Sequence, residues 1–410
     1  MPVAPCHRQR FTRLLCAAFV VALAGCASAP VPVPAGGSDA RRVPERLADS
    51  TYWRLMTELS EPWGVFRSEN FVSNETSLQW VIPALQRTVR PGSVYLGVAP
   101  DQNFTYILAT RPSIAFIVDI RHQNAVQHLM YKALIETSKD RAEFLSKLFS
   151  RVPLAGVDST SPAHVLFDAL ANTRPDSARY RANLGAIVER LTKVHRFALS
   201  DSELVSLNCV YGAFFTQGQT LNYSFSSECR NPGQLGGMRG GGGGGFGGPG
   251  GMPSFLEMSL ESDSAGLNRG YLASEANFRM LKDYEQRNLI VPVTGNFAGG
   301  KSLRAVGQWA REHDARIGAF YVSNVEQYLF QQGDEAARFY ENVATLPTDA
   351  SSTFIRSFSG GFRNSGTFTV PLRAQSGRSL QLISGVEELV AAFRKGEVRS
   401  WMEVIARSRQ

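Results

Sequence analysis

The chain has 410 residues, of which 43% are hydrophobic and 19% are charged, and its formal net charge is +7 at pH 7. That length is sufficient for one large domain or two modest ones. Lysine and arginine form no block and no basic–aromatic stripe along the chain, which argues against a nucleic-acid-binding protein.

The N-terminus predicts a lipid anchor. Residues 1–25 begin with a basic segment, followed by the apolar run LLCAAFVVALA, which is too short to span a bilayer permanently. The residues LAGC, ending in Cys26, resemble the lipobox of bacterial lipoproteins, which implies cleavage before Cys26 and its lipidation. Alanine rather than aspartate follows the cysteine, so we expect an outer-membrane lipoprotein of the bacterial cell envelope that faces the periplasm. An ordinary signal peptide with an incidental cysteine is the alternative.

The composition then changes along the chain in a way that predicts its organisation. Residues 26–49 are rich in Pro, Ala and Gly and predict a tether. We expect an α/β domain over residues 50–360, with a helical insertion at about 139–280, and a strand-and-helix extension over 361–410. Twelve of the sixteen residues at 236–251 are glycines, which predicts a disordered loop within the insertion.

Apolar runs and helical patterns alternate along the chain. The strongest strand patterns are VYLGV at 94–98, SIAFIVDI at 113–120, LIVPVT at 289–294 and RIGAFYVS at 316–323, and weaker ones are TFIRSFS, FTVPL and SLQLIS after residue 350. The four strong runs are apolar throughout, as in strands buried on both faces. Helical patterns separate them, which favours a doubly wound, mostly parallel α/β sheet of Rossmann-like type.

The ends of the first two strands carry a candidate ligand site. In open parallel sheets, ligands bind beyond the carboxyl ends of the strands where the strand order switches. Gly97 closes the first strand in a tight turn, and Asp119 ends the second at about the spacing from which an acidic residue reaches a nucleoside ribose. Ordinary βαβ construction without a ligand is the alternative, because the turn has one glycine where dinucleotide-binding proteins have three.

These strands carry a resemblance. VYLGVAP and IAFIVDI resemble the first two motifs of class I S-adenosylmethionine-dependent methyltransferases. Longer blocks, such as NFVSNE and YLASEANFRMLKDYEQRNLIVPVTGNFAG, resemble an uncharacterised bacterial lipoprotein family that looks built on the same fold. The resemblance implies that Gly97 and Ala99 line a nucleoside site and that Asp119 holds the ribose. It also places Asn296 and Phe297 at the end of the fourth strand, near the transferable methyl group.

One of these positions departs from the family. The resemblance implies an aspartate at the position where this chain has Asn296. An amide cannot accept a proton at working pH, so the departure argues against general-base chemistry at this position.

The stretch VTGNFAGGKSL at 293–303 fits the phosphate-loop pattern G-x-x-x-x-G-K-S/T through Gly295, Gly300, Lys301 and Ser302. A strand pattern precedes it and a helical pattern follows, as such a loop requires. A phosphate loop also needs a later strand ending in aspartate to hold magnesium, whereas the next strand pattern ends in Ser and Asn. A P-loop NTPase is therefore the less favoured alternative to a chance match.

Other polar residues have weaker patterns. Asn74 and Glu75, in NFVSNE, either reach the strand-end cleft or cap a following helix. His122 and His128 do not have metal-ligand spacing, so we expect no metal site.

Two cysteines remain in the mature chain besides the lipidated one. Cys209 and Cys229 form a disulfide candidate, because an exported chain meets oxidising conditions; two free thiols are the alternative.

Two classes of function remain open. The first is an S-adenosylmethionine-dependent transferase that binds a nucleoside-type small molecule at the strand ends. The second is a non-catalytic envelope binding or interaction protein that has lost cofactor use. The compartment favours the second, because S-adenosylmethionine is made in the cytosol and an envelope protein rarely meets it.

Overall fold

The structure is a computed structural model of the chain, and it describes residues 42–66, 68–223, 252–359 and 379–410. Residues from Ala40 to Gln410 form one compact unit. The predicted signal peptide with Cys26, the glycine-rich loop, Cys229 and the FTVPL pattern lie outside the described residues. No helix within the described ranges is long and apolar enough to cross a membrane.

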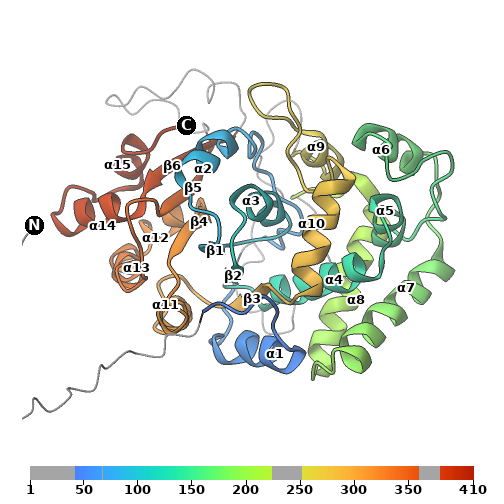
Figure 1. The fold of residues 1–410 in the computed structure, drawn as a ribbon, viewed down its shortest axis with the longest axis horizontal. Helices are drawn as coiled ribbons and strands as arrows, with labels where there is room; N and C mark the ends of the chain where they lie inside the picture. The colour runs from blue at the N-terminus through green and yellow to red at the C-terminus, as the bar shows by residue number, and fades with distance from the viewer. Residues whose placement is uncertain (1–41, 67, 224–251, 360–378) are drawn as a thin grey trace, which may run out of the picture. The chain divides into compact units, whose positions relative to one another are not determined.

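A six-stranded sheet lies at the centre of the unit, in the order β3-β2-β1-β4-β5-β6 (Figure 1). The strands are β1 Val94–Gly97, β2 Ile114–Asp119, β3 Ile290–Thr294, β4 Ile317–Ser323, β5 Thr353–Ser359 and β6 Ser379–Gly385. Neighbouring strands from β3 to β5 are parallel, and β6 is antiparallel to β5. The four strong strand patterns are β1 to β4, which confirms the predicted doubly wound, mostly parallel α/β fold.

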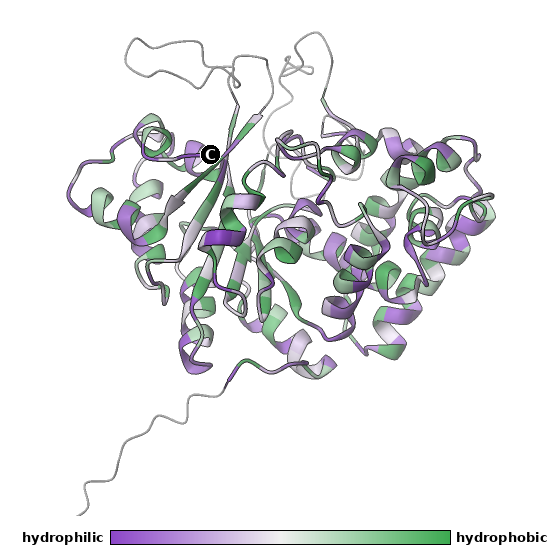
Figure 2. Cartoon of the chain, turned by 45° about the horizontal axis from the view of Figure 1, so that its top comes forward, coloured by the Kyte–Doolittle hydropathy of each residue, from purple (hydrophilic) through white to green (hydrophobic). Residues whose placement is uncertain are grey.

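Helices flank the sheet on both sides (Figure 1). Those outside the insertion are α1 Asp49–Glu58, α2 Ile82–Thr88, α3 Gln102–Thr110, α4 His122–Thr137, α10 Glu275–Gln286, α11 Ser302–Glu312, α12 Val325–Leu329, α13 Glu335–Val343, α14 Val386–Arg394 and α15 Trp401–Ala406. One group, with α2, α3, α4 and α10, packs together on one side; α11, α13 and α14 lie on the other. Hydrophobic residues concentrate in the strands and recur along the helices (Figure 2), and the buried ones form the core around the sheet.

Between β2 and β3 the chain adds a mainly helical region. Its elements are α5 Arg141–Leu148, α6 Ala163–Ala171, α7 Ser177–Glu189, the π-helix η1 Arg190–Val194, α8 Asp201–Gln217, the short 3₁₀-helix η2 Gly218–Thr220 and α9 Phe255–Leu260. Helix α8 packs on α4, which also contacts β2, β3 and α10. Helix α4 is therefore buried on nearly every side, polar residues included.

One helix begins later than its pattern predicts. The pattern TSLQWVIPALQRT predicts a helix from residue 76, but α2 begins at Ile82, with Pro83 in its first turn. Proline is favoured at that position because its missing N–H would have no partner there. The preceding residues, including Ser77 with a φ of 66°, form turns instead, and they belong to the candidate site.

Candidate functional site

The carboxyl ends of β1 and β4 mark the switch point of the sheet. The chain runs outward from β1 through β2 to β3 and then returns to place β4 on the other side of β1. This is the position where ligands bind in open α/β sheets. In this chain the segment between α1 and α2 crosses that edge of the sheet. We call its described residues, 59–66 and 68–79, the strap.

The strap is hydrogen-bonded to the strand ends from one edge of the sheet to the other. At β3, the amide of Thr294 donates to Ser60 Oγ (2.9 Å), and the amide of Glu61 donates to the Thr294 carbonyl (3.0 Å). After β2, the amide of Gly64 donates to the Ile120 carbonyl (2.9 Å). Further along, hydroxyl contacts join Thr76 to Ser379 of β6.

Two further contacts fix the middle of the strap to the start of α4. Arg121 Nη1 donates to the Glu69 carbonyl, and Gln127 Nε2 donates to the Phe71 carbonyl (2.7 Å). The strap thus covers the strand ends, a position that the sequence analysis considered only for Asn74 and Glu75.

The predicted phosphate loop holds a carboxylate of the strap. The amide of Asn296 donates to Glu61 Oε1 (2.7 Å), and the amide of Lys301 donates to Glu61 Oε2 (3.1 Å). A Cβ at Gly299 would lie 2.2 Å from Glu61 Oε1, so the loop closes around the carboxylate. The ammonium of Lys301 donates to the Ser60 carbonyl (2.6 Å). Backbone N–H groups at the start of α11 therefore bind an anion, as this motif predicts, but the anion belongs to the chain itself.

The hydroxyl of Ser302 is also committed within the fold. It is buried and donates to the Thr294 carbonyl (3.2 Å). A Cβ at Gly295 would lie 2.2 Å from this hydroxyl oxygen, so glycine is needed there for packing. Both motif residues thus have structural roles at the β3–α11 turn.

Asp119 lies at the end of β2, as predicted, but its carboxylate is fully used. Arg121 donates to Asp119 Oδ1 from Nε (3.0 Å) and to Oδ2 from Nη2 (2.8 Å). The backbone amides of Arg121 (2.8 Å) and Ala99 (3.1 Å) complete the set. Both side chains of this ion pair are about 5% exposed or less. The position of a ribose-binding acid is therefore occupied by an internal bidentate ion pair.

The turn after β1 closes around Asn103. Its Nδ2 donates to three successive carbonyls, of Val98, Ala99 and Pro100, at 2.7 to 3.0 Å. A Cβ at Gly97 would lie 1.9 Å from Asn103 Oδ1. Ala99 has a left-handed φ of 68°, which turns its amide toward Asp119. Glycine is needed at position 97 for the close approach of an asparagine side chain, with no ligand between them.

Glu75 is brought to the switch point. The hydroxyls of Tyr321 (2.6 Å) and Ser323 donate to its carboxyl group, and so does Gln381 Nε2 (3.3 Å). Burial raises the pKa of Glu75, and the three donors counteract part of that rise. Asn74 is half-buried and contacts Met252 Sδ (3.8 Å). Neither residue caps α2, because that helix begins seven residues after Glu75.

Asn296 and Phe297 do not lie at the switch point. The strand before them is β3, the edge strand beside β2, and not the strand that pairs with β1 on its other side. The expectation that they follow the fourth strand is therefore wrong, because the fourth strand is Ile317–Ser323. Asn296 Oδ1 accepts from the amide of Ala298 (3.0 Å), and Phe297 is buried against Phe320.

Beneath the strap, one face of α4 carries polar atoms without a partner among the described residues. They are Asn124 Nδ2 and His128 Nδ1, whereas the side chains of Gln127 and Tyr131 on the same face interact with each other; all four side chains are at most 2% exposed. Burial lowers the pKa of His128 to about 4, so the ring is neutral and donates from Nε2 to the Ala99 carbonyl (3.0 Å). Unsatisfied buried groups of this kind require ordered water or a small polar ligand.

Asp101, in the turn leading into α3, is a buried carboxyl group with a raised pKa. Burial raises its pKa to about 6, although the hydroxyl of Tyr271 donates to its Oδ2 (2.8 Å). This carboxyl group was missed by the sequence reasoning, because only the fold shows that it is enclosed by α3 and the segment before α10.

The remaining predicted residues lie elsewhere. His122 contacts Thr294 Oγ1 (2.8 Å) and Glu203 Oε1 (2.9 Å), and the described residues hold no group of three or more metal-ligating side chains. Cys209 is buried and disulfide-bonded. Cys229 is outside the described residues, so its pairing with Cys209 stays a prediction.

A search among curated proteins gives no match to this chain. The model of one protein family, described as "Domain of unknown function (DUF7790)", matches residues 70–195 and 253–384. The matched segments cover more than half of the chain and include Glu75, Asp119 and Arg121. The chain therefore belongs to the DUF7790 family, which confirms the predicted membership in an uncharacterised family.

Proposed function

We propose that this chain is a lipid-anchored protein of the bacterial cell envelope whose Rossmann-like domain acts as a non-catalytic binding or interaction module. The observation that carries this proposal is the use of Asp119 by Arg121. In a nucleoside-binding sheet this carboxylate accepts from the ribose hydroxyls, whereas here four protein donors occupy its two oxygens. A ligand that took those bonds would leave a buried guanidinium without its partner.

The neighbouring positions support the same proposal. The space beside Gly97 is filled by Asn103, and the anion position of the β3–α11 loop is filled by Glu61. The strap covers the edge between them through hydrogen bonds from β3 to β6. An envelope domain has no access to cytosolic cofactors, so no bound cofactor can stabilise its fold. Side chains of the protein that occupy the cofactor's position would supply that stability instead.

Isothermal titration calorimetry of the purified protein with S-adenosylmethionine and S-adenosylhomocysteine tests the proposal. We expect no heat of binding at millimolar ligand, with circular dichroism confirming that the protein is folded. Saturable binding at micromolar concentration would overturn the proposal and support the transferase alternative.

A second candidate is binding of a nucleoside-type small molecule once the strap lifts. The unpaired polar atoms on α4 favour it, because His128 lies at the turn at Ala99 and the neighbouring Gln127 contacts the strap residue Phe71. The variant Glu61→Ala removes the carboxylate that fixes the strap to the β3–α11 loop. Binding of S-adenosylmethionine or adenosine by this variant, but not by the natural chain, would select the second candidate. The same titration with ATP tests the P-loop alternative.

The anchor is tested separately. Metabolic labelling with an alkyne fatty acid should label the natural chain and not the variant Cys26→Ser, which should also leave the membrane fraction. Labelling of the Cys26→Ser variant would show that the lipid is attached elsewhere, and an unlabelled natural chain would show that the lipid anchor is absent.

A further inference from the structure

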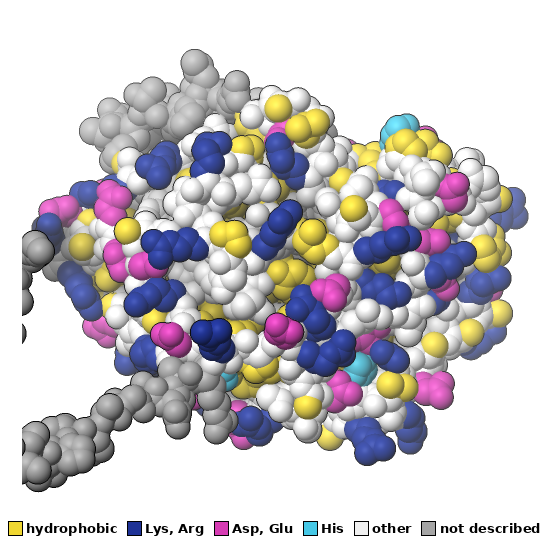
Figure 3. Space-filling view, in the orientation of Figure 1, with side chains coloured by type: hydrophobic (Ala, Val, Ile, Leu, Met, Phe, Trp, Pro, Cys, Tyr) yellow, Lys and Arg dark blue, Asp and Glu magenta, His cyan; other side chains and the backbone are white. Residues whose placement is uncertain are grey.

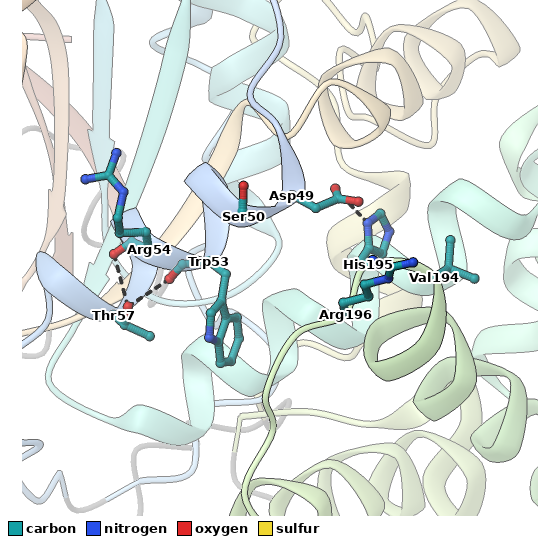
Figure 4. Close-up of a pocket in the computed structure, with 8 residues that line it drawn as sticks. All are labelled: Asp49, Ser50, Trp53, Arg54, Thr57, Val194, His195 and Arg196. Carbon is teal, nitrogen blue, oxygen red and sulfur yellow. Dashed lines mark hydrogen bonds and ion pairs between the residues drawn. The ribbon is translucent and has the colours of Figure 1, made fainter.

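A second site lies away from the strand ends, between α1 and the turn that follows the π-helix η1. A cavity of about 630 Å³ opens there, and its lining residues are Asp49, Ser50, Trp53, Arg54, Thr57, Val194, His195 and Arg196. Figure 4 shows the α1 side chains on one side and Val194, His195 and Arg196, at the end of η1, on the other, joined by the contact between Asp49 and His195. The volume lies within the range of small-molecule sites.

The cavity wall is fixed by a histidine held between two carboxylates. His195 Nδ1 lies 2.9 Å from Asp49 Oδ1, and His195 Nε2 lies 2.7 Å from Glu136 Oε2. Both ring nitrogens are therefore in contact with a carboxylate, which fixes the orientation of the imidazole in the cavity wall.

The buried side of this arrangement is anchored in α4. Glu136 also accepts from Arg190 Nε (2.8 Å) and pairs with Lys132 Nζ (2.7 Å), and both Lys132 and Glu136 have fully buried side chains. Arg190 and His195 reach the same oxygen because η1 has the π-helical repeat, in which the amide of His195 donates to the Arg190 carbonyl. Such π-helical turns are frequent at functional sites.

Aromatic rings complete the rigid wall. The imidazole of His195 stacks on Phe197 (5.1 Å between ring centroids, 15° between planes), and the indole of Trp53 also stacks on Phe197 (5.1 Å, 14°). Trp53 is half-buried, so part of its indole remains open to the cavity. A wall of this kind holds its geometry before any ligand arrives, which lowers the entropic cost of binding.

Arg196 supplies a free cation at the cavity. Its side chain is exposed and has no partner in the part of the chain that the structure describes, whereas Arg54 is paired with Glu58 (3.1 Å). Its backbone is left-handed, with a φ of 57°, at a position just past the helix where glycine is the usual residue.

We propose that this cavity binds a small organic anion with a flat apolar part, with Arg196 attracting the anionic group and Trp53 contacting the flat part. The charges of the lining favour an anion, because the two arginines, Arg54 and Arg196, outnumber the single carboxylate, Asp49. A guanidinium suits a carboxylate or a phosphate ester through bidentate hydrogen bonds. An indole face suits a planar ring.

The test uses benzoate, a carboxylate on a flat ring, with benzamide and acetate as matched probes that lack the charge and the ring. Two-dimensional NMR of the full chain follows the indole N–H of Trp53. We expect benzoate to shift this signal at millimolar concentration, and benzamide and acetate to do so more weakly. The variant Arg196→Asn removes the charge and keeps a residue that accepts the left-handed backbone. It should weaken benzoate binding about fivefold, the upper range for an exposed charge pair.

The matched control is Arg174→Asn, which removes the same charge from an exposed position outside the cavity. It should leave benzoate binding unchanged. The proposal is overturned if benzoate binds no better than benzamide, if no probe shifts the Trp53 signal, or if the two arginine variants weaken binding equally. S-adenosylmethionine and adenosine are absent from this experiment, so its outcome is independent of the strand-end proposal.

Discussion

Replacing Arg121 with leucine should destabilise the fold by leaving a buried carboxylate without its main partner. The Arg121–Asp119 ion pair is nearly inaccessible to solvent, so solvent screening does not weaken it. Removing one member of a buried pair costs about 3–5 kcal/mol of the free energy of unfolding. Asp119 would keep the backbone donors at Ala99 and position 121, so we expect the lower end, about 3 kcal/mol.

The assay is urea-induced unfolding followed by far-UV circular dichroism, on a double-mutant cycle with Asp119→Asn. Because Asp119→Asn removes the charge that Arg121 balances, the double variant should be more stable than the sum of the two single losses predicts, by at least about 1 kcal/mol. The exposed control, Arg174→Leu, should change the free energy of unfolding by less than about 0.5 kcal/mol.

Two results would refute this reasoning. One is a loss of less than about 1 kcal/mol for Arg121→Leu, the size typical of a solvated surface pair. The other is simple additivity in the cycle. Either would mean that water reaches the pair and that the strand ends are open.

Three further predictions follow from the packing and the pKa shifts. Burial raises the pKa of Glu285 to about 8, so its stabilising contribution is greatest at low pH and is lost as the pH rises from about 4 to about 8. The stability of the variant Glu285→Gln relative to the natural chain should therefore rise between about pH 5 and about pH 8 in urea unfolding, and an equal difference at both pH values would contradict the shift. The variant Gly299→Ala would place its Cβ 2.2 Å from Glu61 Oε1 and displace that carboxylate, so it should raise amide hydrogen exchange in the strap as much as Glu61→Ala does; unchanged exchange in both variants would show that Glu61 does not hold the strap. The variant Gly97→Ala, whose Cβ would overlap Asn103, should lower the free energy of unfolding by about 1–3 kcal/mol in the same urea assay, and full stability would mean that the turn is loosely packed.

Continuous apolar runs in the sequence predicted the strands of the sheet, because these strands are buried on both faces. The runs that became β1 to β4 are apolar throughout, a pattern that few other structures produce. The order of the strands was harder to predict from the sequence. Asn296 was predicted to follow the fourth strand, but it follows the third. Local pattern identifies a strand, but a crossover connection decides its neighbours.

The candidate site could be predicted only in part. Gly97 and Asp119 lie at strand ends, where the spacing placed them. Their partners, Asn103 and Arg121, were not identifiable, because an asparagine in a helix and an arginine after a strand have many ordinary roles. The strap was hidden for a different reason: Glu61 reaches the β3–α11 loop across 235 positions of the chain, and no local pattern encodes such a contact.

The measurement that tests the account most directly is native-state amide hydrogen exchange at Ala99, Asn296 and Lys301. These three amides donate to Asp119 and Glu61, the carboxylates that stand where ligand groups would bind. If protein groups permanently fill the strand ends, the three amides should exchange only through global unfolding, as slowly as the amides of the central strands. Exchange at the rate of exposed loops, with the central strands still protected, would show that the edge opens in the native state and would contradict the account.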